Sequence, residues 1–212
     1  LGAVDEASVA IELRPDGKFT KYDTWQDQGQ GGDAGSLICM IQALREYFPD
    51  VTPDDIRLVQ ADTKLCPNTG ESAGSRSHFA NGKASILAAK NLANAMRKED
   101  GTYRTYEEMV AEGIPTRYNG DWTSASEWDD LYDLDPNTGK GNPAYAYIYA
   151  LFLAEAEVDM NTGKTTVTGF RCVDEVGKVG NIQSLDGQAY GGISHSIGFA
   201  LSEDYEDVKK HT

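Results

Sequence analysis

Gln28-Gly29-Gln30-Gly31-Gly32-Asp33-Ala34-Gly35 marks the point at which the predicted fold changes from strand to helix. Upstream of this segment, apolar residues alternate along 7–13 and 19–25, and Arg14-Pro15-Asp16-Gly17 supplies turn residues between them. Alternation with a period of two places the apolar side chains on one face of a strand. The pattern therefore predicts an antiparallel hairpin that leads directly into the glycine-rich segment.

Downstream of the glycine-rich segment, the sequence predicts a helix, a short strand and a second helix. Apolar residues recur at helical spacing over 37–47, and a strand is expected at 56–60. A polar loop over 62–76 precedes a long helix at 78–98 that is rich in alanine, leucine and lysine. The stretch 101–141 is polar and broken by glycine and proline, so we expect it to be irregular apart from one short helix.

The second half of the chain repeats the order of hairpin and helix. Extended patterns over 145–158 and 165–173 are joined by a turn, and Asp186-Gly187-Gln188 is expected to open a helix. Antiparallel hairpins packed with helices are typical of the α+β class, not of a doubly wound sheet. The predicted parts are a first subdomain, a connecting irregular segment, and a second subdomain that is incomplete at its C-terminal end: 1–100, 101–141 and 142–212.

Composition limits the classes of partner. Lys+Arg number 19 and Asp+Glu 34, and the net charge of −15 argues against binding to nucleic acid or anionic membranes. The most apolar stretch, 144–154, is too short to span a bilayer, and the first residues do not resemble a signal peptide. Cys39, Cys66 and Cys172 stand too far apart for a zinc site or an iron–sulfur cluster, and their odd number disfavours a disulfide framework. We therefore expect a soluble protein of a reducing compartment, the cytoplasm.

Three segments carry the candidate binding chemistry, because each places glycine, serine or amide residues at a predicted helix start: 29–35, 72–77 and 187–188. Unpaired backbone N–H groups and the helix dipole favour anions at such positions. The first segment also fits the dinucleotide pattern Gly-x-Gly-x-x-Ala, but the strand before it is expected in a hairpin, not in a parallel β-α-β unit, which disfavours a nicotinamide-binding Rossmann fold. A plain glycine turn and a serine helix cap are the simpler alternatives for the first two segments.

Other arrangements of reactive side chains are unfavourable. His78, His195 and His211 are too scattered for a metal site. Ser194 and His195 are neighbours on a predicted helix, where their side chains diverge and cannot form a triad. We interpret the acidic cluster at 127–135 as a solvated face.

The three glycine- and serine-bearing segments, taken together and in this order, resemble the molybdopterin-binding region of the xanthine oxidase family of molybdenum hydroxylases. The residues that carry the resemblance are Gln28-Gly29-Gln30-Gly31, then Pro67-Asn68-Thr69-Gly70-Glu71-Ser72-Ala73-Gly74-Ser75, then Asp186-Gly187-Gln188-Ala189-Tyr190-Gly191-Gly192. The similarity extends over 1–212 and is greatest to bacterial aldehyde oxidoreductases that use molybdopterin cytosine dinucleotide. It implies molybdenum held by that cofactor, with [2Fe-2S] clusters on other domains or chains.

The resemblance also implies which residues contact the cofactor. Gln30 would donate its side-chain amide to the pterin, and Gln188 would reach the pterin from the third segment. Gly74 makes physical sense, because a Cβ there would crowd the ligands of the metal. Leu1 falls where relatives place a leucine that lines the substrate tunnel. The full implied set of cofactor-binding residues is Gln28, Gln30, Gly31, Gly32, Ser72, Gly74, Ser75, Arg76 and Gln188.

The sequence departs from the family pattern in two ways. Close relatives carry histidine at the position of Gln28, and the family's catalytic base, a glutamate in a Gly-x-Gly-Glu context, has no match in this chain. The resemblance implies oxidation of aldehydes to carboxylic acids with water as the oxygen source, and transfer of electrons to iron–sulfur clusters elsewhere. We therefore expect a fragment or subunit of a larger hydroxylase, homo-oligomeric in its full form, with no catalytic residue or direct metal ligand of its own.

A function of another class stays open at this point, namely a non-catalytic scaffold or assembly module of the same fold that binds no cofactor. One spatial expectation distinguishes the cofactor-binding function from the scaffold function. If the three segments converge around a single pterin–pyrophosphate ligand, the cofactor reading is favoured.

Overall fold

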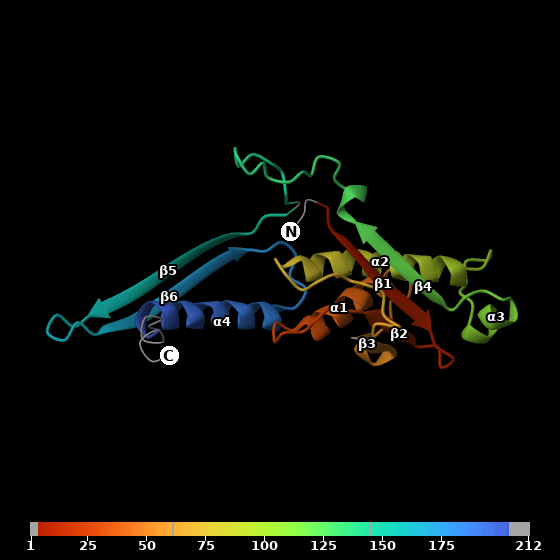
Figure 1. Cartoon of the computed structure of the whole chain (residues 1–212). Coiled ribbons are helices and arrows are strands. Elements are labelled where there is room, and N and C mark those ends of the chain that lie inside the picture. The colour runs from red at the N-terminus through yellow and green to blue at the C-terminus, as the bar shows by residue number, and fades with distance from the viewer. Residues whose placement is uncertain (1–3, 61, 145, 204–212) are drawn as a thin grey trace. The chain divides into compact units, whose positions relative to one another are not determined.

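The computed structural model describes residues 4–60, 62–144 and 146–203 (Figure 1). The chain forms two compact units, 1–145 and 146–212. Leu1, the expected substrate-tunnel residue, lies outside the described residues. None of the described helices is both long enough and apolar enough to cross a membrane.

The first unit is built on a four-stranded sheet with the order β3-β2-β1-β4. β1 (Glu6–Leu13) pairs antiparallel with β2 (Phe19–Asp23) and with β4 (Arg117–Thr123). β3 (Ile56–Gln60) pairs parallel with the other edge of β2. The predicted hairpin is therefore confirmed as β1–β2, and the mixture of antiparallel strands with helices confirms the α+β class.

The parallel pair β2–β3 corrects the expectation that the strand before the glycine-rich segment lies only in a hairpin. α1 (Gly32–Arg45) connects the two strands, so that β2, α1 and β3 form a parallel β-α-β unit within the sheet. Periodicity identifies each of these elements near its observed place, but it does not say which strand pairs with the second edge of β2. β4 also lies in a stretch that was expected to be irregular, because its sequence, RYNGDWT, lacks apolar alternation.

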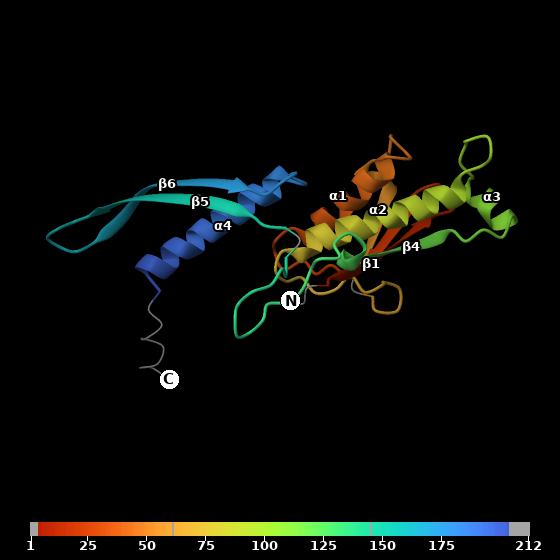
Figure 2. The same cartoon turned by 90° about the horizontal axis from the view of Figure 1, so that it is seen from above.

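Two helices run side by side over the sheet (Figures 1 and 2). α2 (Arg76–Met96) packs against β1, β4 and α1. A Cβ on Gly120 of β4 would overlap the backbone of α2, so glycine is required there for the helix to lie this close to the strand. The fully buried apolar residues between helices and sheet include Val9, Ile11, Met40, Leu44, Ala84, Ala88 and Leu92.

Short helices complete the first unit. The single-turn helices η1 (Pro53–Asp55) and η2 (Ser124–Ser126) precede β3 and follow β4. α3 (Tyr106–Ala111) begins with a capping box, in which Thr105 accepts from the backbone N–H of Glu108 and the Glu108 carboxylate accepts from the N–H of Thr105. α3 confirms the short helix predicted in this region.

The second unit is a hairpin followed by one helix, as predicted. β5 (Tyr149–Val158) and β6 (Thr165–Glu175) pair antiparallel, and α4 spans Ile182–Leu201. The expected helix start at 186–188 is wrong, because the Asn181 side chain accepts the backbone N–H of Ser184 and so caps the helix four residues earlier. No residue of β5 or α4 in this unit is buried, and apolar side chains remain exposed along both.

Candidate cofactor-binding site

Two of the three predicted segments stand at the starts of neighbouring helices in the first unit, and a contact from Gln26, just before the first segment, joins them. The glycine loop (26–31) precedes α1, and the serine–glycine loop (70–75) precedes α2. The backbone N–H of Ser72 donates to Oε1 of Gln26 at 2.8 Å, and the Ser72 hydroxyl donates to the Gln26 carbonyl at 3.0 Å. These bonds hold the starts of both helices beside each other, although the two loops are more than 40 residues apart in sequence.

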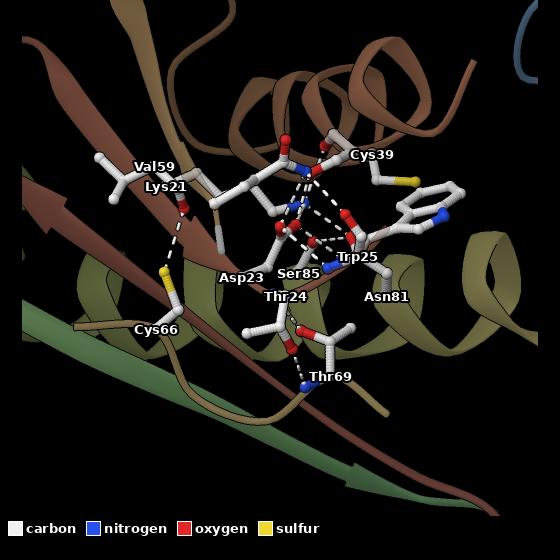
Figure 3. Close-up of polar contacts among 12 residues, drawn as sticks. Lys21, Asp23, Thr24, Trp25, Cys39, Val59, Cys66, Thr69, Asn81 and Ser85 are labelled. Atoms are coloured by element: carbon white, nitrogen blue, oxygen red, sulfur yellow. Dashed lines mark hydrogen bonds and ion pairs between the residues drawn. The ribbon is translucent and has the colours of Figure 1, made fainter. Parts of the chain in front are cut away.

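The serine–glycine loop is placed by pairing with β1. Where β2 ends and turns away, the backbone N–H of Ser8 donates to the Asn68 carbonyl at 3.0 Å, and the Thr69 hydroxyl donates to the Ser8 carbonyl at 3.0 Å. Thr24 and Thr69 then exchange bonds, because each hydroxyl oxygen accepts the other residue's backbone N–H, at 3.0 and 2.9 Å (Figure 3). The residues before the loop, Asn68 and Thr69, therefore lie beside β1 at the point where β2 has ended.

Arg76, the first residue of α2, holds the serine–glycine loop from inside the protein. Arg76 is 5% exposed, and its Nε donates to the Asp5 carboxylate at 2.7 Å. Its Nη1 donates to the carbonyls of Thr69 at 3.1 Å and Glu71 at 2.9 Å. A Cβ on Gly70 would overlap the guanidinium. These bonds give Arg76 a structural role in the loop, and its contact with a cofactor stays a prediction.

The Asp27 carboxylate occupies the start of α1. It accepts the backbone N–H groups of Gly29 at 2.8 Å, Gly31 at 3.3 Å and Asp33 at 3.0 Å. The bonds from Asp33 and Gly29 lower the pKa of Asp27. The expectation that these N–H groups are unpaired is therefore wrong, because a carboxylate of the same loop takes the place in which an external anion was expected.

The start of α2 differs, because its N-cap residue supplies no side-chain cap. Ser75 is the N-cap residue, yet its hydroxyl makes no capping bond. Its φ of 60° makes it the one non-glycine residue with a positive φ among the described residues, and Gly74 before it has a φ of 56°. A left-handed serine costs about 1–2 kcal/mol, and such strain is common at binding sites. Gly74 and Ser75 are exposed at the positive end of α2, where the helix dipole favours negative charge.

The glycine loop contains Gln28 and Gln30, and the side chain of Gln30 makes hydrogen bonds within the loop. The Gln30 Oε1 accepts the backbone N–H of Gln28 at 2.5 Å, and its Nε2 donates to the Gln26 carbonyl at 2.9 Å. One hydrogen of that Nε2 remains for a further acceptor. Gln28 is exposed. In the second unit, Gln188 is exposed on α4, and its contact with the other segments stays a prediction.

A buried polar network beneath the two loops was not predicted from the sequence (Figure 3). Lys21 and Asp23 on β2 are completely buried and lie 3.2 Å apart, from Nζ to the carboxylate. Lys21 also donates to the Ser36 carbonyl at 2.8 Å and to Asn81 Oδ1 at 2.6 Å. Asp23 accepts from the Ser36 hydroxyl, from Asn81 Nδ2 and from Gln60 Nε2.

This network joins β2 to α1 and α2, in each case within two turns of the helix start. Although burial alone raises the pKa of Asp23, the charge of Lys21 and the hydrogen bonds from its neighbours hold that pKa below its usual value. A signal for the network is present in the sequence, because Lys21 and Asp23 share the inward face of the strand with Phe19. Within the described residues, no group of three or more histidine, cysteine or acidic side chains is placed to hold a metal ion.

Comparison with known proteins identifies the fold. A family model described as the molybdopterin cofactor-binding domain matches residues 2–209. The aldehyde oxidoreductase of Megalodesulfovibrio gigas is 40% identical over 211 residues, which are 100% of this chain and 23% of that protein. The crystal structure of the aldehyde oxidoreductase from Desulfovibrio desulfuricans matches with a TM-score of 0.91 and 44% identity, over 100% of this chain and 22% of that one.

The chain thus spans less than a quarter of the length of these two relatives. A CO dehydrogenase from Oligotropha carboxidovorans matches 94% of this chain and 26% of its own with a TM-score of 0.67, and at 19% identity it shares the fold alone. The family match covers nearly the whole chain and confirms the resemblance inferred from the sequence. This chain belongs to the molybdopterin cofactor-binding domain family.

Proposed function

We propose that this chain is the molybdenum cofactor-binding portion of an aldehyde oxidoreductase that oxidises aldehydes to carboxylic acids. Identity of 40% and 44% to two aldehyde oxidoreductases over the full chain supports this activity over those of the more distant relatives. The observation that carries the proposal is the contact between Ser72 and Gln26, because it joins the loop before α1 to the loop before α2, and the resemblance implies that both loops bind the cofactor. The proposed form of the cofactor is molybdopterin cytosine dinucleotide.

The residues at the two loops fit such a ligand. The open start of α2, with Gly74 and Ser75 exposed, suits a phosphate group, since N–H donors and the helix dipole favour negative charge without a charged side chain. Ser72 and Gln30 add polar groups beside it. When bound, the molybdenum cofactor supplies the redox chemistry by which oxygen from water reaches the aldehyde carbon. The residues of this chain bind the cofactor and fix its orientation.

The proposed partners are the remaining parts of the hydroxylase. The base that removes a proton during oxidation, and the [2Fe-2S] clusters that receive the electrons, belong to other segments in this proposal, because no matching residues occur in this chain. We place the full enzyme in the cytoplasm as a homo-oligomer. Three unpaired cysteines support the cytoplasmic location, because reducing compartments keep thiols free.

The proposal is tested on the full-length protein. We expect molybdenum by mass spectrometry and cytidine monophosphate after acid hydrolysis, both in about equal molar amounts to the polypeptide. Addition of an aldehyde should bleach the visible absorption of the iron–sulfur clusters, whereas hypoxanthine and carbon monoxide should not. Active material without molybdenum would refute the cofactor assignment, and bleaching by hypoxanthine alone would refute the substrate class.

The alternative scaffold function makes the opposite prediction. In that case the folded full-length protein contains neither molybdenum nor a pterin, even when it is produced in cells that synthesise the cofactor. Substitution of Gly74 by valine then changes nothing but stability. In an enzyme it also lowers the cofactor content, because a branched side chain fills the space at the open start of α2.

A further inference from the structure

The indole of Trp25 carries a buried donor that has no partner. Trp25 is 6% exposed, and its Nε1 makes no hydrogen bond among the described residues. In Figure 3 no dashed line reaches this nitrogen. Burying a donor without an acceptor costs free energy, so such atoms are rare and require an explanation. Trp122 shows the ordinary situation, because its Nε1 donates to the Glu127 carboxylate at 2.9 Å.

The position of Trp25 is fixed on several sides. Its backbone N–H donates to Asp23, and its carbonyl accepts from Gln60 Nε2 at 3.3 Å. The six-membered ring packs on Gly35 of α1, where an added Cβ would lie 2.7 Å from the ring. The indole also makes an edge contact with His78 of α2, with 5.9 Å between the ring centroids. These contacts with Gly35 and His78 restrict rotation of the indole.

Trp25 Nε1 and Gln30 Nε2 flank the same glycine. A Cβ on Gly32, the first residue of α1, would lie 3.0 Å from each of the two nitrogens. Gln30 cannot supply an acceptor by exchanging its amide atoms, because an oxygen in the place of Nε2 would then face the Gln26 carbonyl oxygen at 2.9 Å. Two donors therefore lie next to the buried Gly32, where the Cβ of any other residue would contact both nitrogens.

We infer that Trp25 donates its indole N–H to an uncharged acceptor, a ring carbonyl oxygen or ring nitrogen, on a heterocycle of the bound cofactor. This inference rests on the proposed function. An uncharged acceptor is favoured over a phosphate because the Asp27 carboxylate already occupies this helix start, and a second anion beside it would be repelled. The open start of α2 is the better place for phosphate.

The test replaces Trp25 in the full-length enzyme by 3-benzothienylalanine, which keeps the two-ring shape and exchanges the N–H for sulfur. The release of molybdenum and pterin from the loaded enzyme in mild denaturant should become about tenfold faster, which corresponds to about 1.4 kcal/mol. The midpoint of thermal unfolding of the cofactor-free enzyme should not fall, because no protein hydrogen bond is lost. The same replacement at Trp122 is the matched control and should lower that midpoint without accelerating release.

Release at the wild-type rate, or a fall in the cofactor-free midpoint equal to that of the Trp122 control, would overturn the inference. Gly32→Ala gives a second measurement, because its methyl group covers the position between the two donors and should also accelerate release. If wild-type enzyme contains no pterin at all, the proposed function fails, and this inference fails with it; a loaded wild type with unchanged release in both variants rejects the inference alone.

Two soluble probes identify the heterocycle in the cofactor-free enzyme. 6-Hydroxymethylpterin presents the pterin, and cytidine monophosphate presents the cytosine. Loss of affinity for either probe on replacement of Trp25 supports the inference and names the ring that accepts the bond. An equal loss of affinity for inorganic pyrophosphate would overturn it, because pyrophosphate offers charged oxygens only.

Discussion

Replacement of Arg76 by methionine tests whether this residue supports the serine–glycine loop from within. The change removes the guanidinium of a side chain that is 4% exposed, its ion pair with Asp5, and its bonds to backbone carbonyls of the loop. Breaking a buried ion pair by removing one partner costs about 3–5 kcal/mol. The Asp5 side chain is 18% exposed, so water recovers part of its solvation and the lower end of the range applies. We expect a loss of about 3 kcal/mol.

The assay is urea unfolding of the full-length protein at neutral pH, followed by circular dichroism. With a denaturant dependence of about 2 kcal/mol per molar urea, the midpoint should fall by about 1.5 M. Arg57→Met is the control, because Arg57 is exposed on β3 and its replacement makes the same change in net charge. That control should change stability by no more than about 0.5 kcal/mol.

Arg76→Lys separates charge from geometry. Lysine keeps the positive charge near Asp5 but lacks the planar fork that reaches several acceptors at once. We expect it to lose about half as much stability as the methionine variant. A methionine variant within about 1 kcal/mol of wild type would refute the supporting role of Arg76. The sequence-based prediction of a cofactor contact would then be the better account of this residue.

Three further changes test the loops and the network beneath them. Gly70→Ala should lower the free energy of unfolding in urea by about 3 kcal/mol, because the new Cβ overlaps the Arg76 guanidinium. Gly113→Ala is the control, since Gly113 has a similar positive φ but open space around it, and it should cost about 1 kcal/mol. Asp27→Ala should destabilise the protein more at pH 7 than at pH 3. The pKa of Asp27 is lowered on folding, so its contribution is fully present above the unfolded pKa of about 4 and is lost as the pH falls through the folded pKa. Equal effects at both pH values would contradict this account. Asn81→Leu should cost about 3 kcal/mol in thermal unfolding, since it leaves the buried ion pair of β2 without two of its hydrogen bonds; a neutral result would show that the network reorganises.

The periodicity of apolar residues predicted most helices and strands of this fold. It failed for an element whose formation depends on contacts with distant parts of the chain. The strand at 56–60 and the hairpin that precedes the glycine loop follow from periodicity alone. β4 was missed because its inward position at Gly120 carries no side chain, so the sequence shows no apolar alternation there. The strand exists because it pairs with β1, and Gly120 is required because α2 lies close to it; both are tertiary properties.

The candidate site shows the same limit at the level of single hydrogen bonds. Sequence identifies which loops stand before helices, and the structure places two of those loops in contact. The sequence does not identify which acceptor a given hydrogen-bond donor contacts. Asp27 is as strong an acceptor for the N–H groups of the glycine loop as a phosphate would be, and Asp5 competes in the same way for Arg76. In both cases the partner inside the chain is already in place when the protein has folded.

The buried network explains how the two loops keep their places. An ion pair in a core is a weak source of stability, because desolvation offsets most of the attraction between the charges. It does, however, have directional bonds, and those of Lys21 and Asp23 end on Ser36 in α1 and on Asn81 in α2, each within two turns of its helix start. An apolar core in the same place would lack bonds with these directions. Because the network connects both helices to the same strand, displacement of either helix start would leave a buried charge with fewer hydrogen-bond partners.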